Sequence, residues 1–355
     1  MSIHASCALQ LRSDPALTMF LRFISARDSR AKLNIDRATL TRILSHHQVM
    51  PAFLDFLFTF GLSEHTKDFH FSGFRSEMNF DDGDTRLVLP QMGRSGRELR
   101  MAYIMRGVER VTSQTSWPWA IRQSAIYHSF DIETARSVWL VVKANKVLKK
   151  RIATLCEDQA LYPAECHEED LRSFDSSLIS HLLVCDWASE QWRWYISYIE
   201  SRVQDLTRDV LTESVDLPVE LRKSPTFPPV SNKPDTDKPT GGGVQAPSAP
   251  AKSFSFEHLQ EVHYVEEKAN EALLVLRANA SVICDLEKCY REAVDALRQS
   301  YPETANITPN DISLKAFQRR INVAAKDSAM HQSRIEALLR LLSDRRSLVC
   351  MKFNW

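Results

Sequence analysis

The chain has 355 residues, of which 44% are hydrophobic and 25% are charged, so it can bury a sizeable core, in about two domains or in one domain plus an extended element. Basic and acidic residues number 45 each, and this balance leaves no net field to attract nucleic acid, an anionic membrane or an acidic substrate. The seven cysteines include no Cys-x-x-Cys pair, which argues against a disulfide framework and a zinc ribbon. We therefore expect a globular protein of a reducing compartment that binds no nucleic acid.

Apolar runs are short throughout the sequence. A membrane-spanning helix needs about 20 mostly apolar residues, whereas the longest uninterrupted apolar runs, such as residues 138–142 and 272–276, have five. The N-terminus lacks the pattern of a signal peptide. From the sequence we expect a protein that is cytoplasmic as given and does not insert directly into a membrane.

The first half of the chain mixes short helical and β-favouring stretches. Its clearest feature is a pair of β-favouring runs separated by residues 131–136, which predicts a hairpin or strand pair. The expected elements are helices at 37–46 and 51–58, strands at 69–74, 99–109, 125–130 and 137–143, and a helix at 146–157.

The second half contains three segments without glycine or proline, at 164–217, 251–301 and 310–355. Either residue inside a helix costs about 1 to 3 kcal/mol relative to alanine, so each segment is predicted to be a long helix. Residues 217–252 between the first two hold eight prolines and a glycine triplet, which is typical of a disordered linker.

The last two segments carry stripes with alternating spacings of three and four residues, which indicate coiled-coil-like packing. The third segment is the more polar of the two at these positions. The stripe of the second segment is Leu259, Val262, Glu266, Ala269, Leu273, Leu276, Ala280, Ile283, Glu287, Tyr290, Val294 and Leu297. That of the third is Phe317, Ile321, Ala324, Ser328, His331, Ile335, Leu338, Leu342, Arg345 and Val349.

These patterns predict a helix-rich α+β fold, in which a mixed α/β N-terminal domain is followed by long coiled-coil-like stalk helices. The predicted plan is an N-terminal extension at 1–40, an α/β domain with a helical end at 41–216, the linker at 217–252 and stalk-like helices at 253–355.

One group of residues resembles a metal site. Imidazole and carboxylate side chains can together hold a divalent ion, but an Asp-Asp-Gly-Asp run is also typical of a solvated turn. The spacing of a calcium loop is missing, so we favour the turn. The metal candidates are His65, Asp68 and His70, with Asp81, Asp82 and Asp84 downstream.

Three further motifs have a functional and a structural interpretation. His128, Asp131 and Glu133 could form an acid/base set, but turns at strand ends collect such residues for their hydrogen bonds alone. Residues 93–97 (GRSGR) lack the Gly-Lys-Ser/Thr ending of a phosphate loop, so a tight basic turn is expected. The tryptophans at 117–119 and 187–194 lack interleaved basic residues and are expected to be core aromatics.

Several stretches, taken in order, resemble the fungal CorA-like transporter domain family. The resemblance covers most of the chain from about position 40 to 349 apart from the linker, and YHSFDIET is its most specific element. The stretches are VMPAFLDFLFTFG (49–61), DFHFSGFR (68–75), GRSGRELRMAY (93–103), RQSAIYHSFDIETARSVWLVVKAN (122–145) and SFSFEHLQEVHYVEEKANEALLVLRANASVI (253–283).

The resemblance implies a cytoplasmic α/β domain that leads into stalk helices, which in the wider superfamily continue into two membrane helices per subunit of a pentameric pore. The signature Gly-Met-Asn tripeptide and both membrane helices are missing from this sequence. No ion-binding residue can be transferred from the family, and no cofactor is expected apart from the ion itself, Mg²⁺.

We therefore expect a regulatory or interaction module related to a Mg²⁺ transporter, not an enzyme and not able to conduct alone. Its expected partners are further copies of itself or full-length CorA-like subunits, which would associate it with the membrane. The alternatives are a soluble coiled-coil scaffold and an enzyme that uses His128, Asp131 and Glu133.

Overall fold

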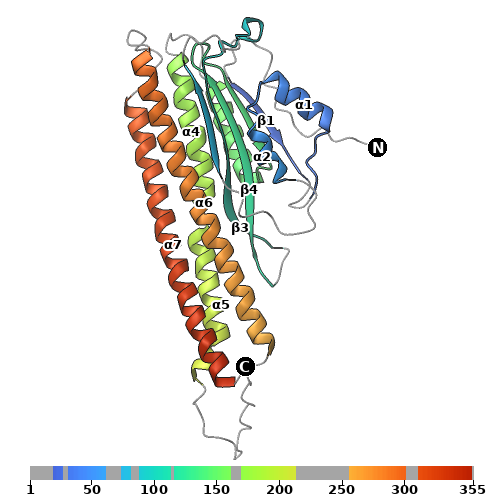
Figure 1. Ribbon diagram of the computed structural model, residues 1–355, viewed down its shortest axis with the longest axis vertical. Coiled ribbons are helices and arrows are strands. Elements are labelled where there is room, and N and C mark those ends of the chain that lie inside the picture. Colours follow the sequence, from blue (N-terminus) through green and yellow to red (C-terminus); the bar gives the residue numbers. More distant parts are fainter. Residues whose placement is uncertain are drawn as a thin grey trace, which may run out of the picture.

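The chain folds into a mixed β-sheet that carries two short helices on one face and a stack of long helices on the other (Figure 1). This arrangement confirms the helix-rich α+β class. The computed structural model describes residues 19–26, 31–60, 73–80, 88–112, 116–160, 169–212, 256–300 and 311–353.

The sheet has five strands in the order β1-β5-β4-β3-β2. All neighbouring pairs are antiparallel except β1 and β5, which are parallel. The expected β4–β5 hairpin and the expected strand at 99–109 are confirmed. The strands are β1 (Met19–Ile24), β2 (Phe74–Asn79), β3 (Glu98–Arg110), β4 (Trp119–Asp131) and β5 (Ser137–Val142).

Strand β1 differs from the sequence prediction, which assigned residues 1–40 to an N-terminal extension. In the structure Met19 pairs with Ser137 and Ile24 with Val142, so β1 forms one edge of the sheet. The side chains of Leu21 and Ile24 in β1 are buried. Its parallel partner, β5, lies more than 100 residues away in the sequence, so no local pattern predicted β1.

The β3–β4 hairpin is the longest part of the sheet. Each strand has 13 residues, which corresponds to about 44 Å. Pairing with β2 ends at Tyr103, and pairing with β5 ends at Ala125. The rest of the hairpin extends beyond these neighbours along α5 and α6 (Figure 1).

One buried side chain of α6 forms hydrogen bonds with this extended part of β3. Asn279 accepts a hydrogen bond from the backbone N–H of Arg106 at 3.1 Å and donates one to its carbonyl at 2.6 Å. Next to it, Gly107 allows close approach of α4, since a Cβ here would lie 3.0 Å from the carbonyl oxygen of Trp187. These two contacts hold the hairpin against the helices.

The two short helices, whose positions in the sequence were predicted, pack on the other face of the sheet. Phe53, Phe56 and Leu57 are buried there, and the ring of Phe53 lies 5.4 Å from that of Tyr127. The helices are α1 (Arg37–His46), whose N-terminus is capped by Asp36, and α2 (Phe53–Phe58).

The long helices form two layers beside the sheet. The helices α4 and α6 contact the strands, and α7 packs on α4, α5 and α6 farther from the sheet (Figure 1). The predicted helix at 146–157 is confirmed as α3, which packs on α4. These helices are α3 (Lys146–Ala160), α4 (Glu169–Ser189), α5 (Trp192–Thr212), α6 (Phe256–Ser300) and α7 (Asp311–Phe353).

The segment predicted as one helix over 164–217 is interrupted between α4 and α5. Gln191 has a φ of 66°, in the left-handed region, and its carbonyl accepts hydrogen bonds from the N–H groups of Trp194 and Tyr195. Glu190 is held by Arg151 of α3. The break contains no glycine or proline, so no residue pattern predicted it.

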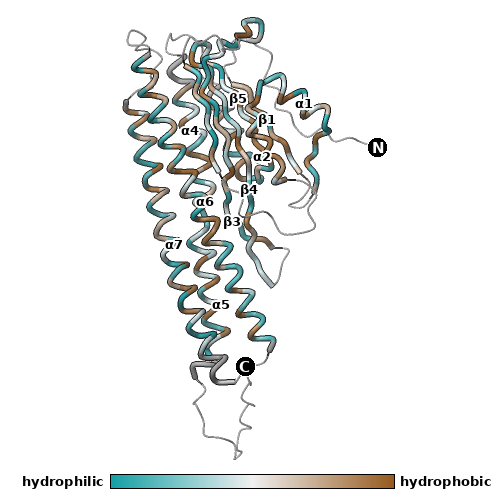
Figure 2. Tube along the Cα trace, in the orientation of Figure 1, coloured by the Kyte–Doolittle hydropathy of each residue, from teal (hydrophilic) through white to brown (hydrophobic). Residues whose placement is uncertain are grey.

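The two predicted stripes face inward. Phe317, Ile321, Ile335 and Leu342 of α7 are buried, and brown hydrophobic positions recur along α6 and α7 in Figure 2. Ser328 is buried in this contact and donates to the carbonyl of Leu276 at 3.2 Å. Helix α6 also buries a second line of residues, because it lies between the sheet and α7. These are Val265, Ala272, Val275, Asn279, Val282, Leu286, Cys289 and Ala293.

Candidate functional site

The residues proposed for a metal site cannot be placed. His65, Asp68 and His70, together with Asp81, Asp82 and Asp84, lie outside the described residues. Within the ranges that the structure does describe, no group of three His, Cys, Asp or Glu side chains could hold a metal ion. The metal candidates therefore stay a prediction.

Asp131 organises the turn between β4 and β5. Its carboxylate accepts hydrogen bonds from the N–H and hydroxyl of Ser95, at 2.7 and 2.8 Å, and from the N–H groups of Glu133 and Thr134, at 3.1 and 3.0 Å. Glu133 pairs with Arg97 at 2.9 Å. Both carboxylates thus stabilise the turn, which agrees with the structural interpretation of these residues.

His128 lies apart from these two carboxylates and is part of a buried hydrogen-bond relay. Its Nδ1 is 3.2 Å from Nε2 of His181, and its Nε2 is 3.2 Å from Oγ of Ser177. Nδ1 of His181 is 2.6 Å from the hydroxyl of Tyr103. We call these four residues the histidine relay. The proposed acid/base set of His128, Asp131 and Glu133 is therefore not assembled.

The relay joins α4 to the middle of the sheet. Ser177 and His181 are four residues apart and so lie on the same face of α4, while Tyr103 and His128 project from β3 and β4. All four side chains are buried, and the indole of Trp139 stacks on His128 at 4.1 Å. The sequence reasoning missed His181, whose only local signal was its spacing from Ser177.

The relay is electrically neutral. Burial lowers the pKa of His128 to about 3, and burial together with the neighbouring His128 lowers the pKa of His181 well below its ordinary value. Burial also raises the pKa of Tyr103 well above its ordinary value. A neutral imidazole has one donor and one acceptor, so the four groups can all be satisfied in one direction along the relay. With no solvent contact, this arrangement ties α4 to the sheet and does not present a reactive group to a substrate.

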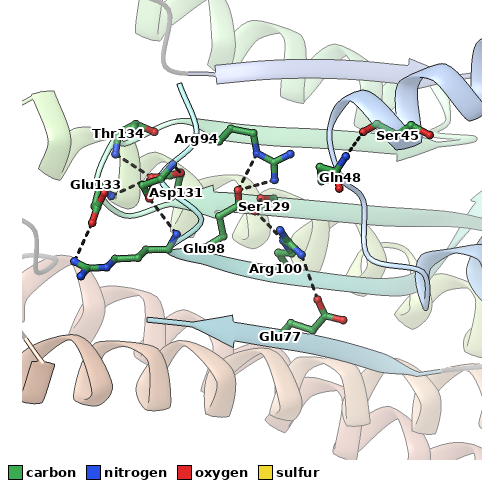
Figure 3. A network of polar contacts seen from close by, with 12 residues as sticks. Ser45, Gln48, Glu77, Arg94, Glu98, Arg100, Ser129, Asp131, Glu133 and Thr134 are labelled. Atoms are coloured by element: carbon green, nitrogen blue, oxygen red, sulfur yellow. Dashed lines mark hydrogen bonds and ion pairs between the residues drawn. The ribbon is translucent and has the colours of Figure 1, made fainter. Parts of the chain in front are cut away.

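A second polar network surrounds the buried carboxylate of Glu98 (Figure 3). Arg94 donates twice to one oxygen, at 2.9 and 2.6 Å, and Arg100 donates to the other at 2.8 Å. Ser129 donates to the latter oxygen at 3.2 Å, and Arg100 also pairs with Glu77 at 3.5 Å. Burial raises the pKa of Glu98, but the two arginines outweigh it and bring the pKa below its ordinary value. The network connects β2 with β3 through ion pairs, and β4 joins it through the hydroxyl of Ser129.

The glycine-rich stretch that precedes β3 forms a tight basic turn, as expected. Gly93 and Gly96 have φ values of 60° and 79°, and Leu89 and Arg94 form a β-bridge. The guanidinium of Arg136 lies against Gly93, where a Cβ would be 2.1 Å from it.

The tryptophans are mostly core residues, which agrees with the expectation. Trp117, Trp119 and Trp192 are buried around Tyr195 at the junction of the hairpin with α5. Trp194 is the exception, since it is 59% exposed with Arg193 stacked over it.

Helix α7 presents a line of large apolar side chains to solvent, on the side opposite its buried stripe. We call Ile312, Val323, Met330 and Leu341 the outer stripe. Their exposed fractions are 73%, 58%, 58% and 39%. The sequence reasoning missed this line, because the inward stripe already accounted for the helical spacing of α7.

A mixed sheet covered by a long helix pair is the architecture that the resemblance implied. A family model described as CorA-like transporters matches residues 3–211 of the 355, which is more than half of the chain. The protein belongs to the CorA-like transporter family and is thereby related to divalent cation transporters. No curated protein matches the chain. Of the helices in the described ranges, none is long and apolar enough to pass through a bilayer.

Proposed function

We propose that this protein is a non-enzymatic regulatory or interaction module of a CorA-like divalent cation transport system. In this proposal the α/β domain supports the α6–α7 pair, and the outer stripe of α7 binds other CorA-like subunits. The transported ion is Mg²⁺, and it passes through full-length partner subunits instead of through this chain alone. Partner binding is what brings the protein to the membrane.

The observation that carries the proposal is the exposure of the outer stripe. An exposed line of apolar side chains along one side of a long helix favours a contact with a further helix. Helix α7 has 43 residues and α6 has 45, so the pair offers a surface of about 65 Å in length. Since α6 is buried on two sides, α7 is the member of the pair that is available for binding.

A soluble coiled-coil scaffold is the second candidate, and the same stripe favours it. An exposed apolar line on a long helix binds any partner helix with matching spacing. The two candidates differ in one measurable consequence, because only the transport module changes the movement of ions.

The test is coexpression of the chain with a full-length CorA-like transporter, with Mg²⁺ influx followed by a fluorescent indicator. We expect the two proteins to purify together and the influx to change, and we expect Val323→Glu with Met330→Glu to abolish both effects. Ala329→Glu is the matched control, because Ala329 is exposed on α7 away from the stripe. In liposomes that contain the chain alone, we expect no Mg²⁺ flux.

Two results would contradict the proposal. One is Mg²⁺ flux through liposomes that contain only this chain. The other is unchanged influx when both proteins are well expressed. Joint purification without any change of influx would instead favour the scaffold.

A further inference from the structure

The buried apolar residues of the long helices form two separate groups, one above the other along the molecule (Figure 1). The upper core joins α3, α4 and the upper parts of α6 and α7 to the sheet. The lower core joins α5 and the lower parts of α6 and α7 to the end of the β3–β4 hairpin. Apolar packing is therefore interrupted at one level of the long axis.

The elements that pass this level carry polar residues, a glycine or a helix break in place of apolar residues. Between the two cores, α6 buries Asn279 and α7 buries Ser328 and His331. The break at Gln191 separates α4, which belongs to the upper core, from α5, which belongs to the lower core. We call these four residues the polar belt, together with the hairpin residues at the same level. The latter are Arg106, Gly107, Gln123 and Ser124.

Hydrogen bonds connect the elements across the belt. Asn279 bonds both backbone groups of Arg106, which joins α6 to β3. The hydroxyl of Ser328 and the amide of Gln332 both donate to the carbonyl of Leu276, at 3.2 and 3.3 Å, which joins α7 to α6. When two surfaces separate, water replaces such hydrogen bonds, but it does not compensate for exposed apolar surface. The belt is therefore the level at which the molecule opens most easily.

His331 lacks a hydrogen bond in the closed belt. The residue is 9% exposed, and its Nδ1 is buried without a partner among the residues that the structure describes. An unpaired buried polar atom destabilises the arrangement that buries it, because water would satisfy the atom. Opening of the belt brings water to Nδ1. The ring of His331 therefore favours the open arrangement.

We propose that the polar belt is a hinge about which the lower core swings as a unit against the upper core, and that His331 promotes opening by taking up a proton. The proposal goes beyond the proposed function, because it concerns a movement of this chain by itself. Helices α6 and α7 run through the belt and would bend there, as long helices do. Helices α4 and α5 already meet at a break.

The direction of the proton effect follows from the surroundings of His331. Burial is the largest influence and lowers the pKa of His331, Asp327 on the same helix raises it, and Arg334 lowers it. In the open belt the ring lies in water, where histidine titrates near pH 6.5. The open state thus binds the proton more tightly. As the pH falls below about 6.5, the equilibrium should shift toward opening, by up to about 10-fold per pH unit.

The other charged groups near this level of the helices are in ion pairs. They come from α4, α5 and α6, which all pack against α7. Carboxylates and guanidinium groups ordinarily keep their charges between about pH 5 and 8, whereas histidine changes its charge there. The pairs are Glu200 with Arg334, Arg277 with Glu336, Asp186 with Arg320 and Glu190 with Arg151.

Spin labels at three exposed positions test the hinge, with distances measured by double electron–electron resonance. Ile179 of α4 and Lys288 of α6 lie above the belt, and Ser201 of α5 lies below it. Labels attached through an unnatural amino acid leave the native cysteines in place. Between about pH 7.5 and about pH 5.5, on either side of the histidine range, both distance distributions that involve position 201 should shift. The distribution between positions 179 and 288 should not change.

Substitutions of His331 test its role as the proton acceptor. His331→Gln cannot take up a proton, so both distributions that involve position 201 should be the same at the two pH values. His331→Leu connects the two cores with an apolar side chain and should hold the closed distribution at both pH values. His263→Gln is the matched control, because it removes an exposed histidine of α6 below the belt and should still respond to pH.

Three results would overturn the proposal. The first is a pair of distributions to position 201 that does not change with pH in the unchanged protein. The second is an equal change in all three distributions, which would show general loosening of the fold instead of a hinge. The third is a wild-type shift in His331→Gln, which would show that another group controls opening. Each of these results would leave the effect on Mg²⁺ influx, and with it the proposed function, standing.

Discussion

Nε2 of His181 lies 3.2 Å from Nδ1 of His128, and both rings are wholly buried between α4 and the sheet. A neutral ring donates from one nitrogen and accepts at the other, whereas a protonated ring donates from both. A proton added to either histidine would therefore leave two donors facing each other or remove an acceptor from the relay. The folded protein keeps both rings neutral.

The histidine pair should make the protein acid-sensitive. Unfolded histidines titrate near pH 6.5, whereas the folded pKa of His128 is about 3 and that of His181 is also lowered. Below pH 6.5 the unfolded chain thus binds more protons than the folded one. The free energy of unfolding should fall as the pH drops from about 6.5 toward 3, by up to about 1.4 kcal/mol per pH unit for each histidine.

Urea unfolding between pH 5 and 7 measures this effect. We expect His181→Gln to reduce the slope of the unfolding free energy against pH, by the amount that corresponds to the uptake of about one proton on unfolding. His263→Gln is the control, because it replaces an exposed histidine of α6 that lies outside the relay. A wild-type slope in His181→Gln would show that the pair does not titrate as described.

Removing the carboxylate of Glu98 should destabilise the fold strongly. Glu98→Gln leaves the guanidinium groups of Arg94 and Arg100 mostly buried without their shared counter-charge. Breaking a buried ion pair from one side costs about 3 to 5 kcal/mol. Glu77→Gln removes a partly exposed partner of Arg100 and should cost less than about 1 kcal/mol. Equal melting temperatures of the two variants would contradict this role of Glu98.

A methyl group at Gly107 should push the hairpin away from α4. The added Cβ would lie 3.0 Å from the carbonyl oxygen of Trp187 and 3.3 Å from its ring. We expect Gly107→Ala to cost about 1 to 3 kcal/mol in thermal unfolding, as overpacked sites do. At Gly73 the nearest atom to an added Cβ is Nη1 of Arg75 at 3.5 Å, so Gly73→Ala is the matched control.

An aspartate in the contact between α6 and its neighbours should weaken the helical layers. Leu276 and Leu273 are both buried there, and an unpaired carboxylate at either position should cost several kcal/mol, about 3 to 5. Asn270→Asp adds the same side chain at an exposed position of the same helix and should be nearly neutral. Chemical unfolding of Leu273→Asp, Leu276→Asp and Asn270→Asp measures the loss of stability in each variant.

Local patterns in the sequence predicted the parts of the fold that depend on local spacing. The inward stripes of α6 and α7 followed from apolar residues at intervals of three and four, and α1 was predicted with its observed bounds. The β4–β5 hairpin followed from two β-favouring runs around one turn.

The remaining features depend on contacts between distant residues. Met19 pairs with Ser137, and His181 meets His128 across 53 positions, so neither contact has a periodic signal. The break at Gln191 uses a left-handed backbone at a residue type that rarely adopts it. The spacing of its residues could have predicted the outer stripe of α7, but only once the buried side of the helix was known.

Asn279 has a consequence for solubility. Exposed strand edges carry unpaired backbone groups that attract the strands of other molecules, which leads to aggregation. The pairing of β3 with β2 ends at Tyr103, and just beyond it the amide of Asn279 occupies both the donor and the acceptor of Arg106. A helix residue 173 positions away thus takes the place that a further strand would fill, and it protects the hairpin from joining a neighbouring chain.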